Sequence, residues 1–231
     1  MDAVGVEMAA AVVPQSMGSD NSAVLEALNE HPGRIVAILK LDVHAPTVVK
    51  TATELLDRGS RGLRLTIFDD REVPWLTDGT VSPLFSLLAR RAGSVAFHCR
   101  PDQLAAVGRV AGQHPELTIF VDHLGRPDVT SGPRADPFEA FLDLARHSNV
   151  LAKTPDSAFF SAAPPPHLDL VPFVERALES FGAERVLWGS DWPVCPDYET
   201  SMQPALTLLA SLSEAERRAV LRDNFERVFC G

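Results

Sequence analysis

Short apolar runs of strand length alternate with helical patterns along the whole chain. The runs are nearly continuous in apolar residues, as expected for strands that are buried on both faces of a parallel sheet. They predict seven strands, at Met8–Val13, Ile35–Leu41, Gly62–Ile67, Ser94–Cys99, Thr118–Asp122, Val150–Lys153 and Val186–Gly189. The stretches between and after them predict helices at Asn21–Glu30, Thr47–Arg58, Pro83–Arg91, Gln103–Gln113, Pro137–Arg146, Leu168–Phe181, Ser201–Ala210 and Glu214–Val228. This alternation predicts an α/β protein with parallel strands and right-handed crossovers.

The connections between these elements are of two kinds. Helix-to-strand links are short, whereas four strand-to-helix links are long and rich in polar residues and proline: Phe68–Ser82, His123–Asp136, Thr154–His167 and Ser190–Thr200. In an α/β barrel such links all lie at the C-terminal face, where function is placed. A doubly wound sheet also binds ligands at carboxyl strand ends, but at a single crevice. Chemically informative residues follow at least five strands here, which favours the barrel.

Length and charge narrow the class of protein. The 231 residues suit one large domain, residues 1–231, because domains average roughly 150 residues. The net charge of −10 disfavours non-specific binding to nucleic acid or to anionic membranes, although it allows a local basic pocket for an acidic substrate. No apolar run approaches the length of a membrane span, and the N-terminus lacks a basic leader. Three widely spaced cysteines fit a reducing cytoplasm, so we expect a cytoplasmic location.

The strand count suggests that one element of the barrel is absent. A barrel of this type closes with eight strand–helix units, and the pattern supplies seven. We therefore expect an open (β/α)8 barrel without its first strand, with unpaired backbone edges at Met8–Val13 and Val186–Gly189. Such edges predict poor solubility or association into a homo-oligomer. Restoring an upstream segment is expected to raise solubility and thermal stability together.

Two strand ends carry the strongest candidates for catalysis. Asp191 follows the last strand in Trp188-Gly189-Ser190-Asp191-Trp192-Pro193, and a carboxylate buried between aromatic side chains tends to have a raised pKa, as a proton shuttle requires. Its alternative role is to cap a helix or stabilise the loop. His123 follows the fifth strand in Val121-Asp122-His123-Leu124-Gly125-Arg126-Pro127 and suits a ligand, a base or an electrophile. Its alternative role is that of a capping or core histidine.

Other strands carry candidates for substrate binding. His98 and Arg100 suit carboxylate or carbonyl binding, and strand alternation places them on one side with Cys99 facing the core. Arg64 lies inside an apolar strand, so it pairs either with a protein carboxylate or with the substrate. Lys153 ends its strand, where an electrostatic role is simpler than a Schiff base.

Several motifs are missing from the sequence. It contains no phosphate-binding loop, no dinucleotide fingerprint and no G-x-S-x-G elbow, and its cysteines do not have the paired spacing of a zinc knot.

The motifs together resemble those of a known family. Gly62-Leu63-Arg64, Val121–Pro127, Asn149–Lys153 and Trp188–Pro193 are similar to motifs of the amidohydrolase-2 family, in the branch that contains 2-pyrone-4,6-dicarboxylate lactonase and sugar-lactone hydrolases. The resemblance covers essentially the whole chain, and the His-Leu-Gly-Arg-Pro and Trp-Gly-Ser-Asp-Trp-Pro motifs are specific to the branch. It implies a (β/α)8 barrel.

The resemblance also implies roles for individual residues. Asp191 matches the aspartate that activates the hydrolytic water, and His123 matches the histidine that polarises the scissile carbonyl. Arg64, Arg100 and Lys153 fall where such enzymes hold substrate carboxylates or oxygens, and lactonase-like members work without a metal. The family's first-strand His-x-His pair is absent, since His31 and His44 do not form it.

Three functions follow from these observations. The first is a hydrolase of a lactone or related small carbonyl compound, with no cofactor and an anionic small-molecule substrate. The second is a hydrolase or decarboxylase of the same fold that depends on a divalent metal such as zinc. The third is a non-catalytic remnant or binding protein. A late start codon or a real truncation would each produce a sequence that lacks the His-x-His strand.

Overall fold

A computed structural model describes residues 1–155, 157–192 and 198–230 of the chain. The predicted link Ser190–Thr200 and the cysteine Cys195 therefore lie partly or wholly outside the described residues. The chain divides into two compact units. The first comprises Met1–His98 and Ala105–Phe120, and the second comprises Cys99–Leu104 and Val121–Gly231.

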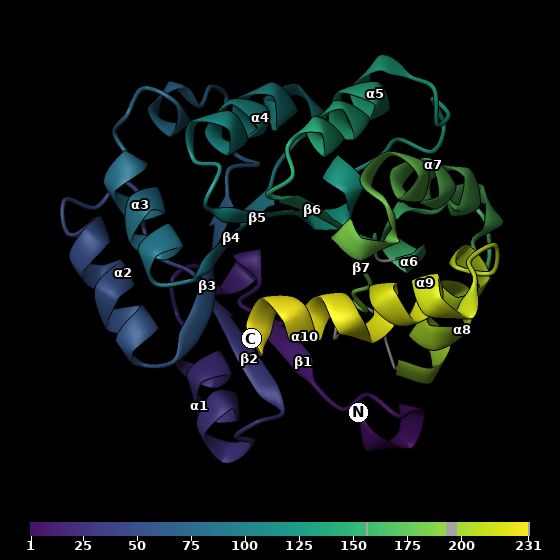
Figure 1. The fold of residues 1–231 in the computed structure, drawn as a ribbon, viewed down its shortest axis with the longest axis horizontal. Helices are drawn as coiled ribbons and strands as arrows, with labels where there is room; N and C mark the ends of the chain where they lie inside the picture. The colour runs from purple at the N-terminus through teal and green to yellow at the C-terminus, as the bar shows by residue number, and fades with distance from the viewer. Residues whose placement is uncertain (156, 193–197, 231) are drawn as a thin grey trace. The chain divides into compact units, whose positions relative to one another are not determined.

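The first unit is built on parallel strands that follow one another in sequence order. They are β1 (Ala9–Val12), β2 (Ile35–Leu39), β3 (Ser60–Thr66), β4 (Ser94–His98) and β5 (Thr118–Val121), whose last residue belongs to the second unit. The helices are α1 (Ser22–Glu30), α2 (Val48–Asp57), α3 (Ser82–Arg90) and α4 (Leu104–Gln113), whose first residue belongs to the second unit. Helix α1 packs on β2, and α2 packs on β3 and α3 (Figure 1).

The register of these strands decides which side chains share a face. Leu39 of β2 lies opposite Leu63 of β3, and Thr66 of β3 lies opposite His98 of β4. Leu63, Phe85 and Phe97 are fully buried in the core of this unit. Because side chains alternate along a strand, Arg64 and Thr66 point away from the face of Leu63.

The second unit combines two short strands with the remaining helices. Strands β6 (Val150–Lys153) and β7 (Val186–Leu187) pair in parallel. The helices are α5 (Asp136–Leu142), α6 (Ser157–Phe160), α7 (Val171–Phe181), α8 (Tyr198–Leu208), α9 (Glu214–Arg218) and α10 (Asn224–Phe229). Four phenylalanines pack α5 against α7, with ring centroids 4.9–5.5 Å apart: Phe138, Phe141, Phe173 and Phe181. These contacts form the core behind the loops that carry polar side chains.

All seven predicted strands are present, and the differences are at their ends. Strand β7 stops at Leu187 rather than at Gly189 because Trp188 donates its N–H to the carbonyl oxygen of Val220 instead of to a strand. The predicted helix 137–146 continues beyond α5 as a 3-10 turn, Asp143–Arg146. Helix α6 was not predicted because it is a single turn inside a proline-rich link.

The chain's C-terminal helices are tied to β7 by a buried side chain. The amide of Asn224 is 2% exposed and donates to the carbonyl oxygens of Ala183 and Val186, each at 2.8 Å. A π-helical segment, Ala219–Asp223, joins α9 to α10. The predicted single helix 214–228 is thus three consecutive helical segments.

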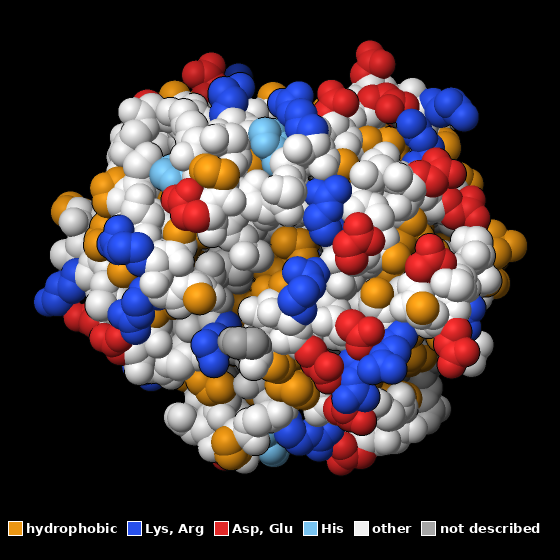
Figure 2. Space-filling model, in the orientation of Figure 1, with side chains coloured by type: hydrophobic (Ala, Val, Ile, Leu, Met, Phe, Trp, Pro, Cys, Tyr) orange, Lys and Arg blue, Asp and Glu red, His pale blue; other side chains and the backbone are white. Residues whose placement is uncertain are grey.

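Two surface properties bear on the expected partners. Among the described residues, no helix combines the length and the apolar composition that crossing a membrane requires. On the face drawn in Figure 2, Lys and Arg side chains are intermixed with Asp and Glu side chains. That face therefore shows no broad basic surface of described residues, in keeping with the net charge of −10.

Candidate active site

The turn after β5 places His123 in the interior of the second unit. Residues Asp122–Gly125 form a 3-10 turn in which His123, Leu124 and Gly125 have φ values of 55°, 51° and 68°. Arg126 continues this run with a φ of 65° and donates its N–H to the carbonyl oxygen of His123 at 2.8 Å. Left-handed backbone costs free energy for residues other than glycine and persists where the surroundings enforce it, often at functional sites.

Gly125 allows this turn to pack closely. A Cβ atom at position 125 would lie 3.1 Å from a ring carbon of Phe141 and 3.2 Å from the side chain of Leu104. Only glycine combines the left-handed conformation with this close approach. The packing buries His123, whose side chain is 6% exposed.

The loop after β7 presents Asp191. Gly189 donates its N–H to the hydroxyl of Thr154 at 3.3 Å, which ties the start of the loop to the end of β6. Trp192 donates its N–H to the hydroxyl of Ser190 at 3.2 Å. Asp191 between them has a φ of 51°, a left-handed conformation that aspartate tolerates better than most residues.

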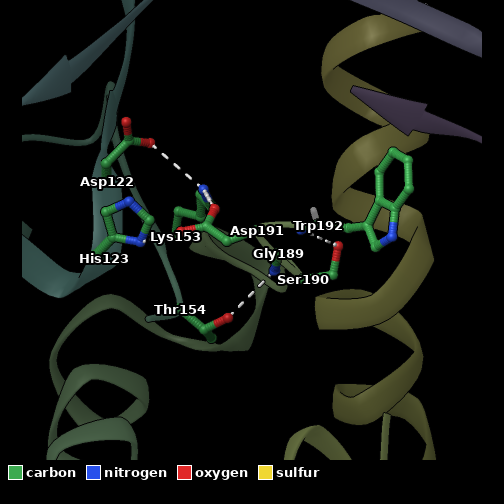
Figure 3. A network of polar contacts seen from close by, with 8 residues as sticks. All are labelled: Asp122, His123, Lys153, Thr154, Gly189, Ser190, Asp191 and Trp192. Carbon is green, nitrogen blue, oxygen red and sulfur yellow. Dashed lines mark hydrogen bonds and ion pairs between the residues drawn. The ribbon is translucent and has the colours of Figure 1, made fainter. Parts of the chain in front are cut away.

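Two polar side chains converge on the carboxylate of Asp191 (Figure 3). The Nζ atom of Lys153 lies 2.6 Å from Oδ1 of Asp191, and Nδ1 of His123 lies 3.2 Å from Oδ2. Lys153 is also 4.0 Å from Oδ1 of Asp122, whose side chain is 4% exposed. Both carboxylate oxygens of Asp191 are therefore contacted by nitrogen-bearing side chains, which orient the carboxylate and favour its ionised form.

The charge state of Asp191 differs from the sequence-based expectation. Burial raises the pKa of this carboxyl, as predicted, but the charges of Lys153 and His123 and the hydrogen bond from Lys153 outweigh it. The net effect lowers the pKa of Asp191 below its ordinary value of 3.8. The prediction of a raised pKa was wrong because it counted burial and omitted a cation contributed by another strand. The carboxyl group of Asp191 is thus ionised at neutral pH.

Gly189, which follows β7, leaves the space through which the side chain of Lys153 passes. A Cβ atom at position 189 would overlap the Cε atom of Lys153. The Lys153 side chain is 18% exposed and passes directly over this glycine to reach Asp191. Neither Gly189 nor Thr154 was a sequence-based candidate, because each acts through a contact with a residue about 35 positions away.

The other predicted site residues have different surroundings. In the second unit, the guanidinium of Arg100 makes a two-point ion pair with Asp102, with distances of 3.0 and 3.1 Å. Strand β4 ends at His98, so the strand alternation used to place Arg100 beside His98 does not extend to it. In the first unit, the His98 ring stacks on Phe68 at 5.7 Å. Substrate binding by Arg64, His98 and Arg100 stays a prediction.

Cys99 is a core residue, as expected. Its residue exposure is 1%, and burial raises the pKa of the thiol to about 12. A thiol with so high a pKa supplies almost no thiolate at neutral pH, so Cys99 does not suit the role of nucleophile.

The donors around Asp191 decide whether the polar cluster can hold a divalent metal ion. Among residues 1–155, 157–192 and 198–230, no group of three or more His, Cys, Asp or Glu side chains is arranged to hold an ion. The ammonium of Lys153 occupies the side of Asp191 that a cation would take, 2.6 Å from Oδ1. The described donors therefore do not fit a divalent ion.

Fold and site together define a hydrolase of the amidohydrolase class, and the comparisons agree. The chain belongs to the amidohydrolase family, whose model, described as Amidohydrolase, matches residues 1–230. It is 30% identical over 239 residues to a 4-sulfomuconolactone hydrolase from Rhizobium radiobacter, covering 99% of this chain and 77% of that protein. It is 35% identical over 139 residues to an L-fucono-1,5-lactonase from Burkholderia ambifaria, covering 58% and 46%.

Solved structures show the same fold. A Pseudomonas putida protein described as a 2-pyrone-4,6-dicarboxylic acid hydrolase is 26% identical, with a TM-score of 0.84 over 99% of this chain and 84% of that one. An amidohydrolase from Burkholderia multivorans, crystallised with bound zinc, is 23% identical, with a TM-score of 0.79 over 100% and 85%. The predicted fold class, the (β/α)8 barrel with seven strands seen here, is confirmed.

Proposed function

We propose that this chain hydrolyses a lactone, using Asp191 as the base that activates water and His123 to polarise the lactone carbonyl. The observation that carries the proposal is the Asp191 carboxylate held between Lys153 and His123. The proposal is supported by the relatives, which are named as hydrolases of sulfonated, dicarboxylic and sugar lactones. The substrate class is therefore a small molecule with a cyclic ester.

The proposed reaction has two steps. In the first, Asp191 takes a proton from water while the water oxygen bonds to the lactone carbonyl carbon. His123 uses Nδ1 toward Asp191 and offers its other ring nitrogen as a hydrogen-bond donor to the carbonyl oxygen, which stabilises the developing negative charge. In the second, the ring C–O bond breaks and Asp191 returns the proton to the leaving oxygen. The product is an open-chain hydroxy acid or its keto tautomer.

Lys153 acts in this scheme as a positioning residue. Its ammonium orients one oxygen of Asp191 and keeps the carboxylate ionised, which leaves the second oxygen toward His123. The ammonium of Lys153 contacts the carboxylate of Asp191, so we assign Lys153 an electrostatic role and not that of a Schiff-base lysine.

Substrate specificity is tested with a panel of lactones. Purified protein is assayed against sulfonated, carboxylated and neutral sugar lactones by following acid release with a pH indicator. Turnover of at least one member at a rate above the rate of the Asp191→Asn variant supports the proposal. Failure to hydrolyse every member refutes it.

Removal of metal is expected to leave activity unchanged. The described donors do not fit a divalent ion, and Lys153 already neutralises Asp191. We expect the same kcat before and after dialysis against a chelator, with elemental analysis of the same samples. Loss of activity on chelation that zinc restores contradicts this prediction and favours the metal-dependent alternative.

A single methyl group at position 189 is expected to disturb the site while sparing the fold. In Gly189→Ala the new Cβ displaces the flexible end of Lys153 from Asp191. Losing a charge-assisted hydrogen bond costs about 1.5–3 kcal/mol, so kcat/KM is expected to fall about tenfold or more. The chain should still fold by circular dichroism, with a lower thermal midpoint because Lys153 and Asp191 no longer compensate each other. The control is Lys153→Met with and without Gly189→Ala. If the methyl acts through Lys153, it adds no further loss in that background.

A further inference from the structure

The single-turn helix α6 places an aromatic side chain against the ring of His123. The ring centroids of Phe160 and His123 are 5.3 Å apart, and the planes of the two rings are inclined by 32°. One edge of the histidine is directed by the 3.2 Å contact between Nδ1 and Asp191. The torsion that turns a histidine ring about its Cβ–Cγ bond is broad, with no sharply preferred angle of its own. Contact with a second ring therefore restricts the direction in which the other nitrogen points.

The turn that carries His123 contacts the same phenylalanine through a second side chain. The guanidinium carbon of Arg126 lies 5.2 Å from the centroid of the Phe160 ring, within the range of a cation–π contact. Arg126 and His123 belong to one left-handed turn and are joined by a 2.8 Å backbone hydrogen bond. Two residues of this turn thus contact Phe160, so a shift of α6 acts directly on the ring of His123.

A carboxylate outside the polar cluster fixes the end of α6. The hydroxyl of Ser161, directly after α6, donates to Oδ1 of Asp169, and the N–H groups of Ala162 and Ala163 donate to Oδ2 at 2.8 and 3.2 Å. Burial raises the pKa of Asp169, but these hydrogen bonds outweigh burial and hold the pKa below its ordinary value of 3.8. An ionised acceptor forms hydrogen bonds roughly twice as strong as a neutral one. Because a helix of one turn is not stable by itself, α6 depends on anchors of this kind for its position.

We infer that Phe160 is a positioning residue that holds the His123 ring in its catalytic orientation, and that Asp169 keeps Phe160 in place by fixing α6. The inference rests on the proposed function and deepens it, because it assigns the orientation of the carbonyl-polarising group to the link after β6. A preorganised donor stabilises a transition state only when it points at the oxygen that becomes charged. Phe160 and Asp169 were not sequence-based candidates, because each acts through a contact that exists only in the folded chain.

The first test separates the phenylalanine that contacts His123 from its neighbour. Phe160→Leu removes the ring, Phe160→Tyr keeps it, and Phe159→Leu makes the same change at the adjacent position of α6, where the residue is 61% exposed. We expect Phe160→Leu to lower kcat about 10–100-fold with little change in KM, because a misaligned group loses transition-state stabilisation rather than substrate binding. Phe160→Tyr should keep most of kcat, and Phe159→Leu should match the wild type. Equal effects of Phe160→Leu and Phe159→Leu overturn the inference.

The second test compares Asp169 with a carboxylate in similar surroundings. Asp128 also accepts hydrogen bonds from the residues that follow it, from the N–H of Thr130 at 2.9 Å and the hydroxyl of Ser131 at 2.6 Å, so Asp128→Asn is the matched control. Asp169→Asn should lower kcat in the same direction as Phe160→Leu, and Asp128→Asn should not. The double variant Asp169→Asn/Phe160→Leu should lose no more than Phe160→Leu alone, because the anchor acts through that ring. Additive losses overturn the role of Asp169.

Nuclear magnetic resonance of the whole chain without ligand reads the ring contact independently of activity. The His123 ring protons, assigned by comparison with His123→Gln, should show nuclear Overhauser contacts to the Phe160 ring. Phe160→Leu should shift the His123 signals through loss of a ring current, and Asp169→Asn should weaken the contacts that Asp128→Asn preserves. A general loss of stability does not single out one of the seven histidines. A wild type without these contacts overturns the inference, as do unchanged His123 signals in Phe160→Leu.

The two readouts separate this inference from the proposed function. If the wild type hydrolyses lactones and Phe160→Leu keeps kcat, the inference fails while the proposed function stands. If no lactone is hydrolysed, the proposed function fails, and the Overhauser contacts still decide whether Phe160 and Asp169 orient His123.

Discussion

Asp191→Asn is expected to lose most lactone hydrolysis while keeping the fold. The amide has nearly the shape of the carboxylate but cannot accept a proton from water, and general acid–base groups contribute on the order of 10²–10⁴-fold to rate. The measurement is kcat/KM on the best substrate of the lactone panel, with circular dichroism to confirm folding. Turnover close to that of the wild type in a folded Asn variant would falsify the assignment of Asp191 as the base.

Two controls separate catalysis from stability in this experiment. Asp57→Asn also removes a carboxylate that makes a 2.6 Å ion pair, in this case with Arg91. Both side chains of that pair are exposed, so the variant should leave kcat/KM unchanged. Asp191→Asn leaves the ammonium of Lys153 without its closest carboxylate, so we expect a lower thermal midpoint. The double variant Asp191→Asn/Lys153→Met should recover that midpoint without recovering activity.

Lys153→Met is expected to move the acid limb of the pH profile to higher pH. In the wild type, Lys153 and His123 hold the pKa of Asp191 below 3.8, so the carboxylate stays ionised and activity persists until the pH falls through this lowered value. Without the ammonium, burial acts with less opposition and raises the pKa of Asp191. The same loss of activity should then occur at a higher pH than in the wild type.

The measurement is kcat/KM against pH for wild type, Lys153→Met and Lys153→Arg. The arginine variant keeps a positive charge next to Asp191 and should keep the acid limb near that of the wild type. Lys50→Met is the surface control and should not shift the profile. Superimposable profiles for the wild type and Lys153→Met show that Lys153 does not set the charge state of the base.

The alternation of apolar runs and helical patterns was enough to predict the fold class. All seven strands were predicted within a few residues of their observed ends, because strands buried on both faces must be apolar throughout. The errors occurred where tertiary contacts override local pattern. Strand β7 stops at Leu187 because Trp188 bonds to the C-terminal helices, a contact between residues 32 positions apart that no local window contains.

The candidate site was predicted in part. His123, Lys153 and Asp191 were selected from three separate strand ends, and the structure brings all three into contact. The sequence could propose them because charged residues that directly follow apolar strands lie at the carboxyl ends of a parallel sheet. It could not show that Lys153 bonds to Asp191 rather than pointing to substrate, since that choice depends on the distance between β6 and the loop after β7.

The sequence by itself determined the strands, their order of appearance and the residue types available at their ends, because these depend on local hydrophobic periodicity. Only the tertiary structure decided the charge state of Asp191 and the close passage of Lys153 over Gly189. Each depends on electrostatic or steric interactions that fall off within a few ångströms. Residues 36–68 positions apart in the chain reach such distances only after the strands have paired.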